Sequence, residues 1–305
     1  MTLFEPVHRR RVILDTDAKN EADDQFAIVH ALLTPSFDIR GIIPAHFGRE
    51  RTSTSMKESR AEVDLLLQLM EWPDPVTIAD GAPDAMPDEL TPVDSPGARL
   101  IIDEAHKEGS PLWVAFLGPL TDMASAILLD PTIVNRDVIV VWIGGGPYRD
   151  RHAAYWPEFN LRNDIHAANV VFESGMTVYQ VPMSTYVMVA VGYAELLEKV
   201  APCGAIGAYL VDQTMTWNSQ FSTNIYSDPF EARSLGDSPA IGIMMYPANA
   251  AIRLQSPVRF AADGGYEPSE RGRPIHVVEN CDTRHLLEDM FAQLKAFAAQ
   301  RKGSG

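Results

Sequence analysis

The stretch Val12-Ile13-Leu14-Asp15-Thr16-Asp17 decides the fold, because an apolar run ends abruptly in carboxylates. An uninterrupted apolar run is typical of a strand that is buried on both faces of a parallel sheet. After a polar loop, residues 23–33 predict a mostly apolar helix that stops at Thr34-Pro35. We therefore expect a buried strand followed by a buried helix, with acidic side chains at the junction between them.

The same alternation of strand and helix continues along the chain. Further strands are predicted at 37–43, 76–79, 112–117, 138–143, 177–181, 258–261 and 275–278. Further helices are predicted at 53–72, 95–109, 120–129, 164–173, 193–221 with a break at 202–204, and 285–301. This order indicates an α/β fold with a mostly parallel central sheet and helices on both faces. No internal repeat or low-complexity linker is visible, so one domain over residues 1–305 is expected.

The composition is acidic, with 25 Lys and Arg against 41 Asp and Glu and a formal net charge of −16. Nucleic acids and anionic membranes require a basic face, so neither is an expected partner. No apolar run approaches the roughly 20 residues of a membrane span, and no signal-peptide pattern precedes the first acidic cluster. Two cysteines without metal-type spacing, Cys203 and Cys281, fit a reducing compartment. We predict a soluble cytoplasmic protein.

The chemistry is expected beyond the carboxyl ends of the strands, where parallel α/β sheets bind their ligands. Four carboxylates lie within ten residues at the first strand end: Asp15, Asp17, Asp23 and Asp24. A helix N-terminus stabilises one or two of them, and the others need either a cation or contact with water. The spacing leaves two interpretations: a capped helix with solvated acids, or a site for a hard cation such as Ca²⁺, which binds roughly six to eight oxygens. No His and Cys cluster indicates zinc.

Four sequence motifs, spread over about residues 12 to 247, occur in the same order as in a known protein family. They are Val12 to Asp17 followed by Asp23-Asp24, then Leu117 to Asp122, then Ile143 to Gly146 followed by Pro157 to Asn160 and Asn163-Asp164, and finally Gly236 to Ala240. Each motif alone is weak, but the ordered set resembles the nucleoside hydrolases. The resemblance implies a Rossmann-like nucleoside hydrolase fold. It also implies calcium-dependent hydrolysis of the N-glycosidic bond of a ribonucleoside or related riboside by a metal-bound water.

The resemblance further implies roles for particular residues. Asp17 would bind calcium and act as the general base that takes a proton from the attacking water. Asp24 and Asp237 would bind calcium through carboxylate oxygens, and Thr121 through its main-chain carbonyl. An acidic pocket of this kind favours the positive charge that develops on the sugar during cleavage.

The resemblance assigns the sugar hydroxyls to Asp23, Glu158 and Asn160. Members of the family are typically dimers or tetramers, so a homo-oligomer with a small-molecule nucleoside or glycoside substrate is expected. The loop before Asp23 departs from the family pattern, since it is two residues longer than usual. Asn20 in this loop is a candidate for a sugar contact.

Three further departures concern the substrate half of the site. Arg49 stands after Gly48 where the family has an asparagine, and it suits either an anionic substrate group or a surface salt bridge. His152 replaces another asparagine and is interpreted either as a general acid or as a loop histidine. Gly236 replaces a histidine that the family associates with the departing base.

Two aromatic residues are candidates for substrate binding near these departures. Trp156 can form a platform for a flat leaving group, and Tyr226 can line the pocket, although packing is the more common role of such aromatic residues. Two other functions remain open: hydrolysis of a different glycoside or carbohydrate derivative on the same fold, and calcium-stabilised sugar or nucleoside binding without turnover. Asp17 argues against the second, because a binding protein has no need of a base.

Overall fold

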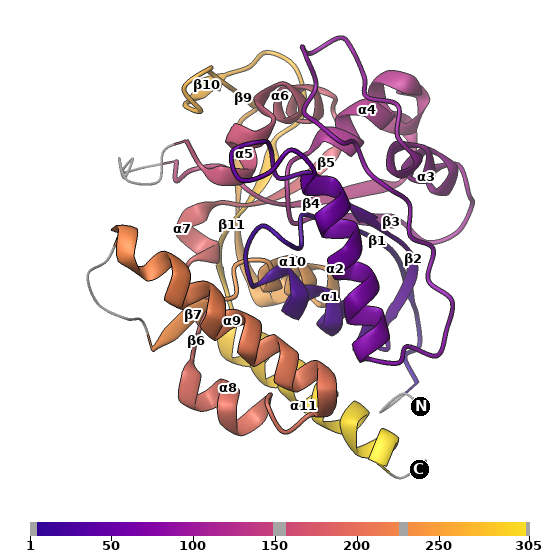
Figure 1. Ribbon diagram of the computed structural model, residues 1–305. Helices are drawn as coiled ribbons and strands as arrows, with labels where there is room; N and C mark the ends of the chain where they lie inside the picture. Colours follow the sequence, from indigo (N-terminus) through magenta and orange to yellow (C-terminus); the bar gives the residue numbers. More distant parts are fainter. Residues whose placement is uncertain (1–4, 149–156, 226–230, 303–305) are drawn as a thin grey trace.

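A seven-stranded sheet forms the centre of the computed structural model, which describes residues 5–148, 157–225 and 231–302 (Figure 1). The strand order is β2-β1-β3-β4-β5-β11-β8. The strands are β1 (Arg10–Thr16), β2 (Phe37–Pro44), β3 (Leu112–Phe116), β4 (Val138–Ile143), β5 (Thr177–Val181), β8 (Ala250–Gln255) and β11 (Ile275–Cys281). Neighbouring strands pair in parallel except for β8, which runs antiparallel to β11. The predicted mostly parallel sheet is therefore confirmed.

Side chains of the central strands point alternately into two hydrophobic cores, which explains the uninterrupted apolar runs. In β1, Val12 and Leu14 belong to one core and Ile13 to the other. Helices cover both faces (Figure 1). The first face carries α1 (Asp24–Leu33), α2 (Ser55–Leu69), α8 (Tyr193–Lys199), α9 (Gly204–Ile225), α10 (Ser238–Met245) and α11 (Thr283–Lys302). The second face carries α3 (Pro96–Ala105), α4 (Thr121–Leu129) and α6 (Ile165–Glu173).

Short elements connect these layers. They are α5 (Phe159–Asn163), α7 (Met183–Tyr186), the antiparallel pair β6 (Ala190–Gly192) and β7 (Ala232–Ser234), the antiparallel pair β9 (Val258–Phe260) and β10 (Tyr266–Pro268), and the 3₁₀ turns at Pro131–Asn135 and Pro247–Asn249. Among the helices that the structure describes, none is long and apolar enough to cross a membrane.

Two strand predictions need correction. The segment 76–79 forms only an isolated bridge between Ile78 and Ile42, because the prolines around it lack the N–H groups that a ladder requires. The segment 258–261 contains β9, which pairs with β10 outside the central sheet. The sheet edge is formed instead by β8, whose partly exposed, mixed sequence gives no continuous apolar signal.

Asp15 in β1 and Asp122 in α4 form a buried pair of neighbouring carboxyl groups. Asp122 accepts hydrogen bonds from the main-chain N–H of Ala82 at 3.0 and 3.1 Å and from the hydroxyl of Ser95. Burial, with Asp122 beside it, raises the pKa of Asp15 well above its usual range, which favours the protonated form of Asp15. A side chain at Gly81 would press on Asp122, since a Cβ there would lie 2.5 Å from Asp122 Oδ2.

We expect Asp122→Ala to lower the free energy of unfolding by about 2–4 kcal/mol, because each buried polar group left without a partner costs about 1–3 kcal/mol. Denaturant unfolding followed by circular dichroism measures the change. Asp94→Ala is the matched control, since Asp94 forms an exposed ion pair with Arg99 at 2.8 Å and such pairs contribute little. Equal unfolding midpoints for the two variants would contradict the buried role of Asp122.

Candidate active site

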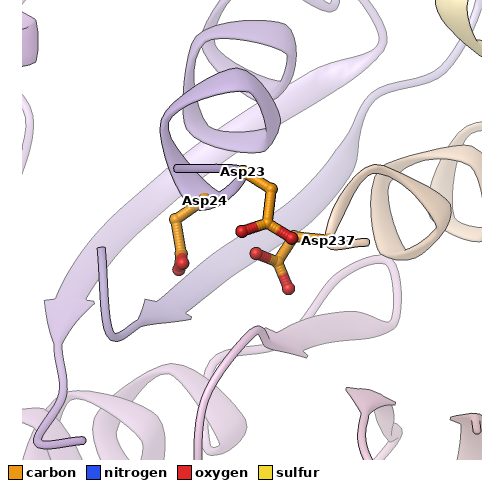
Figure 2. A group of neighbouring side chains, drawn as sticks. All are labelled: Asp23, Asp24 and Asp237. Atoms are coloured by element: carbon orange, nitrogen blue, oxygen red, sulfur yellow. The ribbon is translucent and has the colours of Figure 1, made fainter. Parts of the chain in front are cut away.

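Three carboxylates from distant parts of the chain meet at the carboxyl edge of the sheet. Asp23 and Asp24 begin α1, and Asp237 precedes α10, which packs against α1. Oxygen atoms of the three side chains all lie within 4.8 Å of one another. Figure 2 shows Asp23 and Asp237 pointing toward one another, with Asp24 beside them. Two helix N-termini converge here, and their positive ends favour negative charge.

In the acidic cluster Asp23, Asp24 and Asp237, the last two side chains are buried and Asp23 is partly buried, and burial opposes the charged form of each group. Burial and the neighbouring Asp23 raise the pKa of Asp24 to about 8, although Asp24 accepts a hydrogen bond of 2.5 Å from the hydroxyl of Thr16. Burial raises the pKa of Asp23 to about 6. Burial, followed by Asp24, raises the pKa of Asp237 well above its usual range. The cluster must therefore hold protons or a cation, and its oxygen atoms suit a hard cation.

Asp17 lies beside this cluster with an oxygen that has no hydrogen-bond partner. Its side chain is 1% exposed, and its Oδ2 atom is buried and unpartnered. Burial, together with Asp24 and Asp23, raises its pKa well above the usual range. Gly118, in the turn after β3, leaves room for it, since a Cβ there would lie 3.0 Å from Asp17 Cγ. A buried carboxylate oxygen without a partner fits a group that binds a cation or accepts a proton.

Thr121, the first residue of α4, is held by a buried hydrogen-bond chain. Its hydroxyl donates to Asp164 Oδ2 at 2.8 Å and accepts from His46 Nε2 at 2.8 Å. The main-chain N–H of Gly48 donates to His46 Nδ1 at 3.2 Å, so the ring proton lies on Nε2. Burial lowers the pKa of His46 to about 4, which keeps the imidazole neutral. The sequence analysis did not single out His46, although it directly follows β2 and precedes the Gly48 turn.

Glu158 caps the N-terminus of α5 and is 2% exposed. Its carboxylate accepts hydrogen bonds from the main-chain N–H groups of Gly145 at 2.8 Å, Leu161 at 2.9 Å and Asn160 at 3.2 Å. The hydroxyl of Tyr186 donates a fourth at 2.9 Å. Burial raises the pKa of Glu158 despite these donors. Glu158 therefore holds the loop after β4 in place. A sugar hydroxyl that donated to this carboxylate would be a fifth hydrogen-bond donor.

Asn160 joins the ends of two strands. Its side-chain amide donates to the carbonyl of Leu117 at 2.6 Å, after β3, and to the carbonyl of Ile143 at 2.9 Å, at the end of β4. Both amide protons are thus engaged by the main chain. A contact between Asn160 and a substrate would have to use its side-chain oxygen.

Gly236 lies against Asp23 and Tyr186. Its main-chain N–H donates to Asp23 Oδ2 at 2.9 Å. A Cβ at this position would lie 3.0 Å from that oxygen and 3.1 Å from Cδ2 of Tyr186. Tyr186 thus fills the space next to the glycine, and no feature of the sequence around Tyr186 predicted this.

Arg233, on β7, brings positive charge to the acidic cluster. Its guanidinium pairs with Glu21 and lies 3.7 Å from Asp23 Oδ1, and its side chain is 15% exposed. Glu21 belongs to the loop that is longer than the family pattern. After His46 and Tyr186, this arginine is the third site residue that the sequence analysis missed, because it contacts Glu21 and Asp23, which are far from it in the sequence.

Asn20 is buried in the same loop as Glu21. Its main-chain N–H donates to the carbonyl of Asp17 at 2.8 Å, and its main-chain and side-chain oxygens accept from Arg51. The Arg51 guanidinium also lies 5.2 Å from the ring centre of Phe159 and 5.0 Å from that of Trp217. Arg51 therefore links the loop after β1, the start of α5 and the helix α9.

The other candidates from the sequence are not placed at the cluster by the structure. Arg49 forms an exposed ion pair with Asp84 at 2.5 Å, so binding a substrate anion would require that pair to open. His152, Trp156 and Tyr226 lie outside the described residues.

Comparison with known proteins identifies the family of this chain. The sequence model of the inosine-uridine preferring nucleoside hydrolases matches residues 12–288. The chain is 25% identical over 266 residues to the probable uridine nucleosidase 1 of Oryza sativa subsp. japonica, covering 80% of this chain and 79% of the relative. It is 26% identical over 186 residues to the pyrimidine-specific ribonucleoside hydrolase RihB of Escherichia coli (strain SE11), covering 56% of this chain and 58% of the relative.

Solved structures share the fold. A plant nucleoside hydrolase, the PpNRh1 enzyme, superposes with a TM-score of 0.79 at 19% identity, covering 94% of this chain and 99% of that one. A purine-preferring ribonucleoside hydrolase from Gardnerella vaginalis gives a TM-score of 0.78 at 20% identity, covering 95% and 99%. The family match spans β1 through the start of α11 and includes every residue of the acidic cluster. The chain therefore belongs to the inosine-uridine preferring nucleoside hydrolase family.

Proposed function

We propose that this nucleoside hydrolase cleaves the N-glycosidic bond of a ribonucleoside or related riboside and depends on calcium to do so. One observation carries the proposal: the buried, unpartnered Oδ2 of Asp17 lies beside the acidic cluster Asp23, Asp24 and Asp237. A carboxylate in this setting has the proton affinity of a general base and the ligand chemistry of a hard-cation site.

Asp17, Asp24 and Asp237 are the proposed carboxylate ligands of the ion, with the main-chain carbonyl of Thr121 as a fourth. The raised pKa values of the three acids support this assignment, because a cation would favour the charged form of each. The chain from His46 through Thr121 to Asp164 fixes the turn that would present the carbonyl. When bound, the ion would supply Lewis-acid activation of the attacking water.

We assign the remaining steps of the reaction to individual side chains. Asp17 accepts a proton as water attacks the anomeric carbon, and the bond from that carbon to the leaving nitrogen breaks. Asp23 binds the sugar hydroxyls together with Glu158 and Asn160. The acidic cluster stabilises the positive charge that develops on the sugar. The departing nitrogen gains a proton, for which His152 is our candidate donor.

A second candidate function keeps the same chemistry and changes the leaving group. The contact between Gly236 and Tyr186 favours it, because a ring edge stands where a hydrogen-bonding side chain would otherwise project. A binding protein without turnover is less well supported, since the unpartnered oxygen of Asp17 would then have no use. We further propose a homo-oligomer, as the resemblance implies, in the cytoplasm, which the low cysteine content favours.

Calcium should stabilise the protein more at pH 8 than at pH 5. The folded pKa values of Asp23 and Asp24, about 6 and about 8, lie above the unfolded value of about 3.9. The folded metal-free protein therefore binds more protons than the unfolded chain, and its stability falls as pH rises from about 4 to about 8. A cation that favours the ionised acids reverses this loss. Melting temperatures of chelated and calcium-loaded protein across this pH range test it.

Asp24→Ala should abolish most of the calcium-induced rise in melting temperature. Asp103→Ala is the control, because Asp103 lies on the exposed side of α3 and should leave the rise intact. An unchanged calcium-induced rise in melting temperature in Asp24→Ala would show that Asp24 does not bind the ion.

Asp17→Asn should lower the turnover number on the true substrate by about 10²–10⁴-fold, which is the usual contribution of a general base. The amide keeps the size and can still offer an oxygen to the ion, but it cannot accept a proton. Release of reducing sugar measures turnover, and calcium content measured in the same sample shows whether the metal is retained. A drop of less than about tenfold with calcium retained would assign the base to another residue.

A further inference from the structure

Tyr186 connects the two acidic residues that we assign to the sugar. It ends α7, directly after β5, and its hydroxyl donates to Glu158 at 2.9 Å. Its ring lies against Gly236, whose N–H is bonded to Asp23. The side chain thus spans the distance from Glu158 to the contact between Gly236 and Asp23, along one wall of the site.

The main chain fixes Tyr186 and Gly236 next to one another. The hydroxyl of Ser234 donates to the carbonyl of Tyr186 at 3.0 Å, and the N–H of Leu235 donates to the carbonyl of Val189 at 2.7 Å. The strands β6 and β7 continue this pairing beyond these residues. Because both backbones are held, neither position can move away when the other becomes larger.

We propose that Tyr186 is a specificity-determining residue that forms one coupled wall with Gly236 and selects ribosides whose leaving group needs no proton or hydrogen bond from that wall. This inference rests on the proposed function. The hydroxyl of Tyr186 donates to Glu158, so the wall presents ring carbon atoms beside Asp23. Such a surface contacts an aromatic leaving group favourably but cannot protonate it. Electron-poor aromatic groups, such as nitrophenolate, leave without that help.

The crowding at Gly236 makes the coupling testable. A Cβ would lie 3.0 Å from Asp23 Oδ2 and 3.1 Å from Tyr186 Cδ2, and an imidazole needs further room beyond it. Gly236→His should therefore be tolerated only when the tyrosine ring is removed. The experiment compares wild type, Tyr186→Ala, Gly236→His and the double variant, each loaded with calcium, on 4-nitrophenyl riboside, uridine and inosine.

We expect wild type to favour the nitrophenyl riboside. The double variant should raise the ratio of kcat/KM for uridine or inosine over the nitrophenyl riboside by about tenfold or more, while Gly236→His alone should not. An equal rise in Gly236→His alone, or an unchanged ratio in a folded double variant, would overturn the proposal.

Melting temperatures test the coupling between Tyr186 and Gly236 without any assay of hydrolysis, so this test does not depend on the proposed function. Gly236→Ala adds only the Cβ, so it should lower the melting temperature in the presence of Tyr186 and lower it less in the Tyr186→Ala background. The same lowering in both backgrounds would refute the coupling, whether or not any riboside is cleaved. Suppose that this coupling is present but that neither wild type nor any variant cleaves any of the three ribosides. The proposed function is then wrong, and so is the proposal that Tyr186 selects among ribosides.

Discussion

The mutual repulsion of buried carboxylates is the constraint on which the rest of this site depends. Asp17, Asp23, Asp24 and Asp237 approach one another at the end of β1 and at two helix N-termini. Burial alone would neutralise them, and their raised pKa values express that tendency. Helix dipoles and Arg233 reduce the repulsion, but a bound cation would remove most of it. The same repulsion that destabilises the metal-free site thus makes it selective for a cation.

The surrounding fold supplies hydrogen bonds to several polar groups at the carboxyl ends of the strands. Asp15, although it belongs to the same motif, lies beside Asp122, and burial raises its pKa well above the usual range. Asn160 joins the ends of β3 and β4, and Glu158 is held by four donors. The buried Oδ2 of Asp17 has no hydrogen-bond partner, and the same is true of both carboxylate oxygens of Asp15 and of the hydroxyl of Ser238. Of these groups, Asp17 lies next to the acidic cluster, where an unpartnered carboxylate oxygen fits a functional role.

Sequence patterns predicted the parts of the molecule that depend on local chemistry. The apolar runs of β1, β3 and β4 are buried on both faces, so they were visible without any knowledge of tertiary contacts. The edge strand β8 was missed because a partly exposed strand carries a mixed sequence.

The acids of the candidate site were also visible in the sequence, since several of them cluster at one strand end. Tyr186, Arg233 and His46 were not, because each acts through contacts with residues far away in the chain. For Arg49 the sequence left two interpretations, an anionic substrate group or a surface salt bridge, and the structure shows an exposed ion pair with Asp84.

The central claim is that the acidic cluster holds calcium for hydrolysis of a riboside. Its most direct test is sugar release from a panel of ribosides by chelated protein during stepwise return of calcium, with bound calcium measured in parallel. The account predicts that at least one riboside is cleaved, and that the rate rises with bound calcium and levels off at about one ion per chain. Cleavage that is indifferent to calcium, or a calcium-loaded protein that cleaves no riboside, would contradict it.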